Sequence, residues 1–168
     1  MYRRLYGRPA FAASGQPLAT SQPVREDEGM TEREAFIEAI AARGDMTIRV
    51  GAYPEPHPDS PDGAADVAWL KRKVDAGASS AITQFFFDAD TFFRFRDACA
   101  AAGIAAPVIP GILPIQSWAG AKRFAARCGT SVPAWAEDAF ARAGKPGEAA
   151  LARDIAVHDT RFVVNYWR

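Results

Sequence analysis

The sequence predicts an α/β fold in which parallel strands alternate with helices. Three β-rich segments lie at about residues 46–52, 81–87 and 107–113, and stretches with helical periodicity separate them. This alternation is typical of βαβ units, which build parallel sheets. Because the carboxyl ends of parallel strands meet at one edge, and ligands bind at that edge in such folds, we expect a functional site there.

Capping residues and glycines delimit the expected helices. Thr31 and Glu34 fit a capping box at the start of the first helix. Asp88 or Asp90 can cap the helix that follows the second strand. Four helices are expected to end at or just before a glycine, in chain order Gly44, Gly77, Gly103 and Gly129.

The second helix carries a clear apolar stripe. Its residues Val67, Leu70 and Val74 recur at intervals of three and four, which predicts that they face the core. Beyond the third strand we expect three more helices, over 117–128, after Pro133 and over about 147–157. Three strands in 168 residues are too few to close a parallel sheet into a barrel.

Composition limits the classes of function. The chain has 20 basic and 20 acidic residues, so no net charge favours nucleic acid. Its apolar runs are shorter than the roughly 20 residues of a membrane span, and we expect a cytoplasmic protein. Cys99 and Cys128 lack neighbouring ligands, so no metal site is expected. Residues 1–30 are predicted to be poorly ordered, and residues 31–168 to form the domain.

A proline-rich loop follows the first strand. The stretch GAYPEPHPDS, residues 51–60, combines prolines with an aromatic ring, an imidazole and two acids. Proline fixes its own backbone and restricts the residue before it. Such a loop could hold Tyr53 for stacking or hydrogen bonding, and His57 as a general acid or a phosphate ligand. The same prolines also fit a rigid turn whose polar residues face water.

The helix after this loop carries a polar stripe. Asp66, Trp69 and Lys73 share one side of the helix, and Arg72 lies on the adjoining flank. The cations could hold phosphates, and the acid could accept a hydrogen bond from a ribose hydroxyl. The alternative is a solvated charged face with local ion pairs.

The second and third strands contain residues that are unusual in buried strands. Thr83 and Gln84 interrupt an apolar run and should point to opposite faces. A buried Gln needs hydrogen-bond partners, which either a ligand or a neighbouring strand can supply. Gly111, between Pro110 and Pro114, suggests a bulge where another backbone or a ligand comes close.

Four motifs, in their order and spacing, carry a resemblance to one family. AYPEPHPDS, LKRKVDAGASSAITQFFFD, FRFRDACAAAGI and PVIPGILPI closely resemble the methylenetetrahydrofolate reductase family over about residues 46–157. The resemblance implies a (β/α)8 TIM barrel, here incomplete, with FAD at the carboxyl ends of the strands. It further implies a flavoprotein oxidoreductase that reduces 5,10-methylenetetrahydrofolate to 5-methyltetrahydrofolate. NADH or NADPH would be the electron donor, in the one-carbon pathway to methionine.

The same resemblance implies site residues by their position in the motifs. Those implied to bind FAD are Tyr53, His57, Asp59, Ser60, Asp66, Arg72 and Lys73. Gln84 and Phe124 are implied to contact the folate substrate. The prolines would then preorganise the loop around the flavin and lower the cost of ordering it on binding. A homo-oligomer, or pairing with the missing part of the barrel, is expected.

Departures from the family pattern leave the catalytic residues unassigned. Trp69 stands where the family often has a polar flavin contact, and Gly120 where it has a second substrate Gln. The family's catalytic glutamate and an essential aspartate have no counterpart in the matched part. The alternative interpretation is therefore a fragment that binds flavin without catalysis, or one that has lost its function.

Overall fold

The computed structural model describes the backbone of residues 32–166 and side chains up to residue 155. The chain divides into two units, Met1–Glu32 and Arg33–Arg168. Apart from Glu32, everything described below belongs to the second unit. The expected disorder of residues 1–30 and the expected cap at Thr31 lie outside the described residues.

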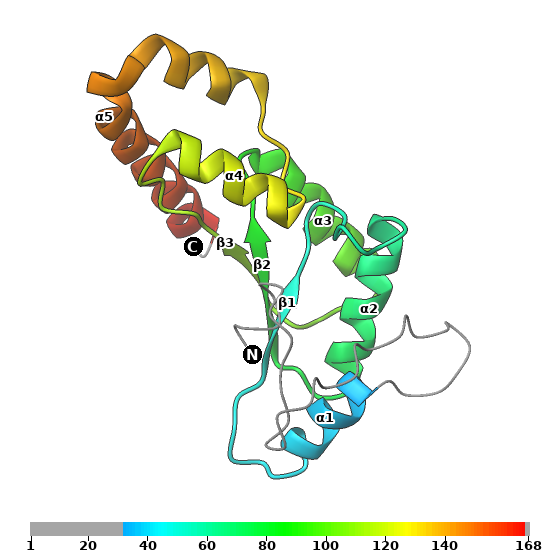
Figure 1. The fold of residues 1–168 in the computed structure, drawn as a ribbon. Helices are drawn as coiled ribbons and strands as arrows, with labels where there is room; N and C mark the ends of the chain where they lie inside the picture. The colour runs from blue at the N-terminus through cyan, green and yellow to red at the C-terminus, as the bar shows by residue number, and fades with distance from the viewer. Residues whose placement is uncertain (1–31, 167–168) are drawn as a thin grey trace, which may run out of the picture. The chain divides into compact units, whose positions relative to one another are not determined.

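The described chain alternates helices with parallel strands (Figure 1). In chain order the elements are α1 (Glu32–Ala41), β1 (Arg49–Ala52), α2 (Gly63–Asp75), β2 (Ser80–Phe85), α3 (Ala89–Ala101), β3 (Val108–Gly111), α4 (Trp118–Cys128) and α5 (Ala134–Tyr166). The strands pair in parallel in the order β1-β2-β3. The expected α/β class, with parallel strands that alternate with helices, is confirmed, and neighbouring strands are consecutive in the chain, as they are in β/α barrels.

Several boundaries differ from the expectation: β1 and β3 are shorter than the expected strands, and the ends of β2 and of the last helix also differ. The second strand ends at Phe85, whose pairing partner Gly111 is the last residue of β3. Beyond it, Phe86 packs against the core under α2 and α3, and Phe87 packs against the cluster of α4 and α5. The last helix continues to Tyr166, beyond the expected end near residue 157. Gly144, with φ 57° and ψ 178°, interrupts α5 between the two helical segments that the sequence predicted.

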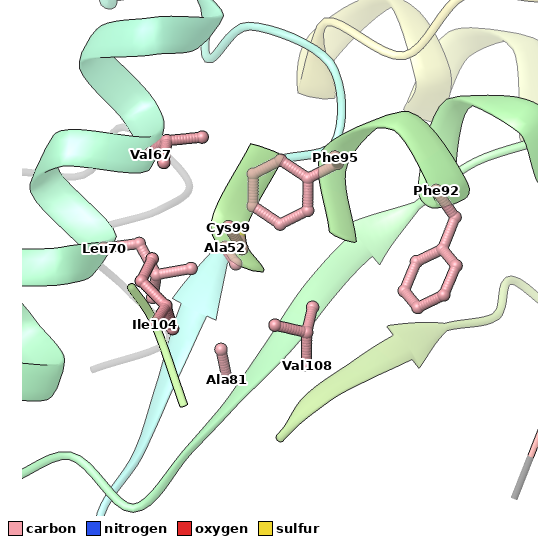
Figure 2. Close-up of a cluster of buried hydrophobic side chains, with 9 residues drawn as sticks. All are labelled: Ala52, Val67, Leu70, Ala81, Phe92, Phe95, Cys99, Ile104 and Val108. Atoms are coloured by element: carbon pink, nitrogen blue, oxygen red, sulfur yellow. The ribbon is translucent and has the colours of Figure 1, made fainter. Parts of the chain in front are cut away.

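The main apolar core lies between the sheet and helices α2 and α3, as Figure 2 shows. Its buried members come from all three strands, from both helices and from one loop: Ala52, Ala81, Val108, Val67, Leu70, Phe92, Phe95, Cys99 and Ile104. The predicted stripe of α2 is confirmed, with Val74 partly buried beside it. Burial raises the pKa of the Cys99 thiol to about 11, so this cysteine is protonated at neutral pH and acts as an apolar core residue.

The register of the sheet fixes which residues face the helices. Ala52 on β1 pairs with Thr83 on β2, and Ala81 pairs with Val108 on β3. Thr83 therefore shares the face of Ala81, toward the helices, whereas Ile82 and Gln84 point to the opposite face. Ile82 is 42% exposed there. The expectation that Thr83 and Gln84 diverge is confirmed.

Gly111 lies where β3 comes closest to β2. A Cβ atom at Gly111 would stand 2.1 Å from the backbone oxygen of Thr83, so no larger residue fits without moving the strands. The Gly111 backbone N–H donates to Thr83 Oγ1 at 2.9 Å, and the β2–β3 register shifts between Ile82 and Phe85. The bulge and the close backbone approach predicted at this glycine are both confirmed.

A partly buried ion pair joins α1 to α2. The Arg72 guanidinium donates through Nε to Glu34 Oε1 at 2.7 Å and through Nη2 to Glu34 Oε2 at 2.8 Å. The Glu34 side chain is 5% exposed, whereas that of Arg72 is 40% exposed and lies 4.9 Å over the Trp69 ring. Two parallel hydrogen bonds of this kind are strong and directional.

A second apolar cluster holds α4 against α5. Trp118 stacks on Phe140 with ring centroids 4.2 Å apart, and its indole N–H donates to Glu137 at 3.1 Å. Glu148 accepts the Trp118 backbone N–H, and Ser117 caps α4 through the Gly120 N–H. Because α5 supplies two of these acceptors, it fixes the start of α4. None of the helices among the described residues is long and apolar enough to cross a membrane.

Replacement of Thr83 by Val tests the link between β2 and β3. The variant keeps the side-chain shape but leaves the Gly111 N–H without its acceptor, so we expect unfolding to become easier by about 1–3 kcal/mol. Urea unfolding followed by circular dichroism measures the change. Thr91→Val is the matched control, since its hydroxyl serves only a surface contact with Arg94, and a loss of equal size there would contradict the assignment.

Replacement of Arg72 by Met tests the ion pair. The variant leaves the buried Glu34 carboxylate without its cation, and we expect the free energy of unfolding to fall by about 2 kcal/mol. The loss is smaller than for a fully buried pair because Arg72 is partly exposed. The double variant Glu34→Leu/Arg72→Met removes both charges and should be more stable than Arg72→Met alone. A double variant that is less stable than the single one would show that the pair is not coupled.

Candidate functional site

The carboxyl ends of β1 and β2 form the edge that carries the candidate site. The proline-rich loop, residues 53–62, leaves β1 at this edge and leads into α2 (Figure 1). The segment that joins α4 to α5 reaches the same edge, because Thr130 Oγ1 donates to the backbone oxygen of Phe85 at 3.2 Å. Two connections far apart in the sequence therefore meet above the sheet.

The loop folds around His57. Its Nδ1 accepts the Asp59 backbone N–H at 3.1 Å, and its backbone oxygen accepts the Ser60 N–H at 2.8 Å. An acceptor Nδ1 places the proton of the neutral ring on Nε2, which is then a hydrogen-bond donor. The Tyr53 and His57 rings meet edge to face with centroids 4.6 Å apart. The loop therefore brings together the two side chains that the sequence singled out.

Asp66 ties the loop to α2. It is 9% exposed, and its Oδ2 accepts the His57 backbone N–H at 2.9 Å. Burial raises the pKa of Tyr53, and the negative charge of Asp66 raises it further, so the phenol is protonated at neutral pH. Asp66, which the sequence predicted on the polar stripe of α2, is thus buried, and one of its carboxylate oxygens holds the loop.

Tyr53 and Lys73 converge on Gly51. Lys73 Nζ lies 3.4 Å from the Gly51 backbone oxygen, and a Cβ atom at Gly51 would lie 4.0 Å from the Tyr53 hydroxyl. Burial lowers the pKa of Lys73 and the nearby positive charge of Arg33 lowers it further, while the negative charges of Asp66 and Glu34 act in the opposite direction. A partly buried cation beside a second cation favours an anion between them.

Three of the residues expected to bind FAD have hydrogen-bond partners within the protein, namely Arg72, Asp59 and Ser60. Arg72 is held by Glu34 of α1, as described above. Asp59 is exposed and contributes its N–H to His57, while Ser60 Oγ donates to the backbone oxygen of Asp62 at 3.3 Å. Asp59 and Ser60 therefore shape the turn that holds the imidazole.

The two residues expected at the folate lie beside Phe85. Gln84 is half-buried, and its Oε1 accepts the Phe85 backbone N–H at 3.0 Å. Phe124 of α4 stacks on the Phe85 ring, with centroids 5.3 Å apart and the planes 11° from parallel. Both residues are thus placed at the end of β2, at the same edge as the loop.

Three residues at this edge were not predicted from the sequence: Arg33, Glu55 and Ser131. Arg33 lies ahead of the recognised motifs, and its charge acts on both Tyr53 and Lys73. Glu55 was visible in the loop, but its carboxylate accepts the backbone N–H of Ser131, 76 residues away. No local pattern could have revealed that contact. Within the described part of the chain, no group of three or more His, Cys, Asp or Glu residues could hold a metal ion.

Comparison with known proteins agrees with the motifs. The sequence model of the family described as "Methylenetetrahydrofolate reductase" matches residues 7–163, a longer stretch than the motifs alone indicated. The "5,10-methylenetetrahydrofolate reductase" of Escherichia coli (strain K12) is 52% identical over 96 residues, which cover 57% of this chain and 32% of that protein. The protein of the same name from Salmonella typhimurium is 53% identical over 91 residues, or 54% of this chain and 31% of that protein.

A plant protein with a similar name also matches this chain. "Methylenetetrahydrofolate reductase (NADH) 1" of Arabidopsis thaliana is 46% identical over 96 residues, which cover 52% of this chain and 16% of that protein. The chain spans about a third of the length of the bacterial relatives it matches. Because the family match extends over nearly all of the sequence, the chain belongs to the methylenetetrahydrofolate reductase family.

Proposed function

We propose that the chain binds FAD at the carboxyl ends of β1 and β2, as part of a reductase of methylenetetrahydrofolate. The observation that carries the proposal is the convergence of Tyr53 and Lys73 on Gly51, in a member of this family. The electron donor would be NADH or NADPH, and the name of the plant relative specifies NADH for that protein. The product would be 5-methyltetrahydrofolate.

The charges at this edge fit a bound dinucleotide. Arg33 and the partly buried Lys73 repel each other, and a phosphate between them would offset that repulsion. Gly51 has no side chain, so the β1 backbone beside the Tyr53 hydroxyl is open to close approach. Neutral Tyr53 and the His57 Nε2–H are donors for flavin or ribityl oxygens.

We assign roles to the remaining residues in the same way. Asp66 would accept from a ribose hydroxyl while it holds His57, and Asp59 and Ser60 would keep the turn in shape. Arg72 would reach a phosphate only by leaving Glu34, so Lys73 is the stronger candidate for that role. Gln84 and Phe124 would contact the folate from the end of β2. A bound flavin supplies the two-electron transfer from the nicotinamide to the folate.

One observation favours a second candidate, flavin binding without turnover. No residue in the matched motifs is assigned as a catalytic acid. The two candidates share the same binding site and differ only in whether the flavin is reduced and reoxidised. The expected homo-oligomer, or pairing with the rest of a barrel, stays a prediction.

The visible spectrum of the purified full chain tests both candidates. After incubation with FAD and gel filtration, we expect protein-bound absorbance near the flavin bands. Bleaching on addition of NADH or NADPH, with recovery on addition of methylenetetrahydrofolate, supports the reductase. A bound flavin that does not respond supports binding without turnover, and folded protein free of flavin would contradict both.

Replacement of Lys73 by Gln tests the phosphate role. We expect the affinity for FAD to fall about tenfold, which corresponds to one charge-assisted hydrogen bond. Lys71→Gln is the matched control, since Lys71 pairs with Asp75 on the same helix. Fluorescence quenching of the flavin measures both dissociation constants, and equal effects in the two variants would contradict the role of Lys73.

The pH dependence of FAD binding follows from the lowered pKa of Lys73. The amine is charged below that pKa and neutral above it, so its attraction for phosphate is present only at a pH below the lowered value. The attraction is lost as the pH rises through the lowered value, before 10.5 is reached. We expect the wild-type affinity to decline in this range and that of Lys73→Gln to change much less. Parallel curves for the two proteins would contradict the assignment.

A further inference from the structure

We infer that Glu55 is a positioning residue, which fastens the proline-rich loop to residues 129–131 and so holds Tyr53 and His57 in place. The contacts that support this inference do not depend on what the site binds. Its expected effect on FAD affinity rests on the proposed function. None of the roles assigned above from the motifs includes Glu55.

The first support is the contact itself. Both oxygens of the Glu55 carboxylate accept the Ser131 backbone N–H, at 3.0 and 3.1 Å. Hydrogen bonds to an ionised acceptor are stronger than neutral ones. Ser131 is 76 residues from Glu55, so the contact closes a long loop of the chain. It joins the connection between β1 and α2 to the connection between α4 and α5.

The second support is the close packing around this contact. Gly129 caps α4 in the left-handed conformation, with φ 70°. A Cβ atom there would lie 3.2 Å from two ring carbons of Pro58 and 3.3 Å from the backbone oxygen of Pro56. The loop therefore lies directly against the end of α4, at a position that a glycine is best able to occupy.

The third support is that residues 129–131 are themselves anchored to the sheet. Thr130 is buried, and its hydroxyl donates to the backbone oxygen of Phe85. Its backbone N–H donates to the backbone oxygen of Ala125 in α4, at 3.0 Å. Glu55 consequently connects the loop, through Ser131 and Thr130, to the end of β2. The hydrogen bond between Glu55 and Ser131 therefore attaches the loop to a segment that is itself hydrogen-bonded to the sheet.

The position of Glu55 explains why the tether acts on the site. It lies between Tyr53 and His57, and Pro54 and Pro56 restrict the backbone on both sides of it. The second tether of the loop is the hydrogen bond from His57 N–H to Asp66 of α2. With both tethers the contact between the Tyr53 and His57 rings is fixed from two directions. Without Glu55 the hydrogen bond to Asp66 and the packing of Pro56 and Pro58 against Gly129 remain.

Four variants of the full chain test the inference. Glu55→Ala removes the acceptor, and Ser131→Pro removes the donor because proline has no N–H. Glu55→Gln keeps a neutral acceptor, and Ser131→Ala keeps the donor and changes only the side chain. We expect FAD affinity to fall about tenfold in Glu55→Ala and in Ser131→Pro, to recover in part in Glu55→Gln, and to stay at the wild-type value in Ser131→Ala.

A second readout needs no ligand. The chain has two histidines, His57 and His158, so the imidazole nitrogens give a simple nuclear magnetic resonance spectrum. In the neutral ring of the wild-type His57 we expect a protonated Nε2 and an acceptor Nδ1. Glu55→Ala and Ser131→Pro should both shift the His57 signals toward a mixture of tautomers, whereas Ser131→Ala should not.

The outcomes separate this inference from the proposed function. If the wild-type chain binds no FAD, the proposed function fails and the imidazole spectra still decide the role of Glu55. The double variant Glu55→Ala/Ser131→Pro should be no worse than either single variant, because both remove one contact. Unchanged His57 signals in Glu55→Ala, or additive losses in the double variant, would overturn the inference.

Discussion

The parallel register between β1 and β2 is the constraint on which the rest of the structure depends. It aligns Ala52 with Thr83, so both strands end at the same edge of the sheet. The hydrogen bond from Gly111 to Thr83 extends this alignment to β3. From that edge the proline-rich loop, α2 and the end of α4 can all reach one another. A shift of the register would separate them, since the proline-rich loop follows the end of β1 and Gln84 lies near the end of β2.

Local sequence patterns predicted much of this fold. The alternation of strands and helices, the buried stripe of α2 and the divergent directions of Thr83 and Gln84 follow from periodicity, which the sequence contains. Asp88 caps α3, and Gly111 lies at a bulge, because capping and close approach demand these residue types. The candidate residues of the loop and of α2 came from motifs that match a family, and the loop does place Tyr53 beside His57.

Contacts between distant residues could not be predicted in the same way. The sequence did not reveal that Glu34, 38 residues away, pairs with the Arg72 guanidinium. The tether from Glu55 to Ser131 spans 76 residues and uses a backbone N–H, which no residue type reveals. Phe86 and Phe87 extend the apolar run of β2 beyond the end of the strand, and they pack against different clusters. Such contacts depend on the tertiary fold.

The central claim is that the proline-rich loop and α2 hold one anionic flavin dinucleotide together. Titration of the isotope-labelled chain with FAD and with riboflavin, followed by backbone and Lys side-chain resonances, tests it most directly. The account predicts that FAD perturbs Gly51, Tyr53 and Lys73 together, and that riboflavin, which lacks phosphate, leaves Lys73 unperturbed. Perturbation by FAD of residues remote from Gly51, with Tyr53 and Lys73 unchanged, would contradict it.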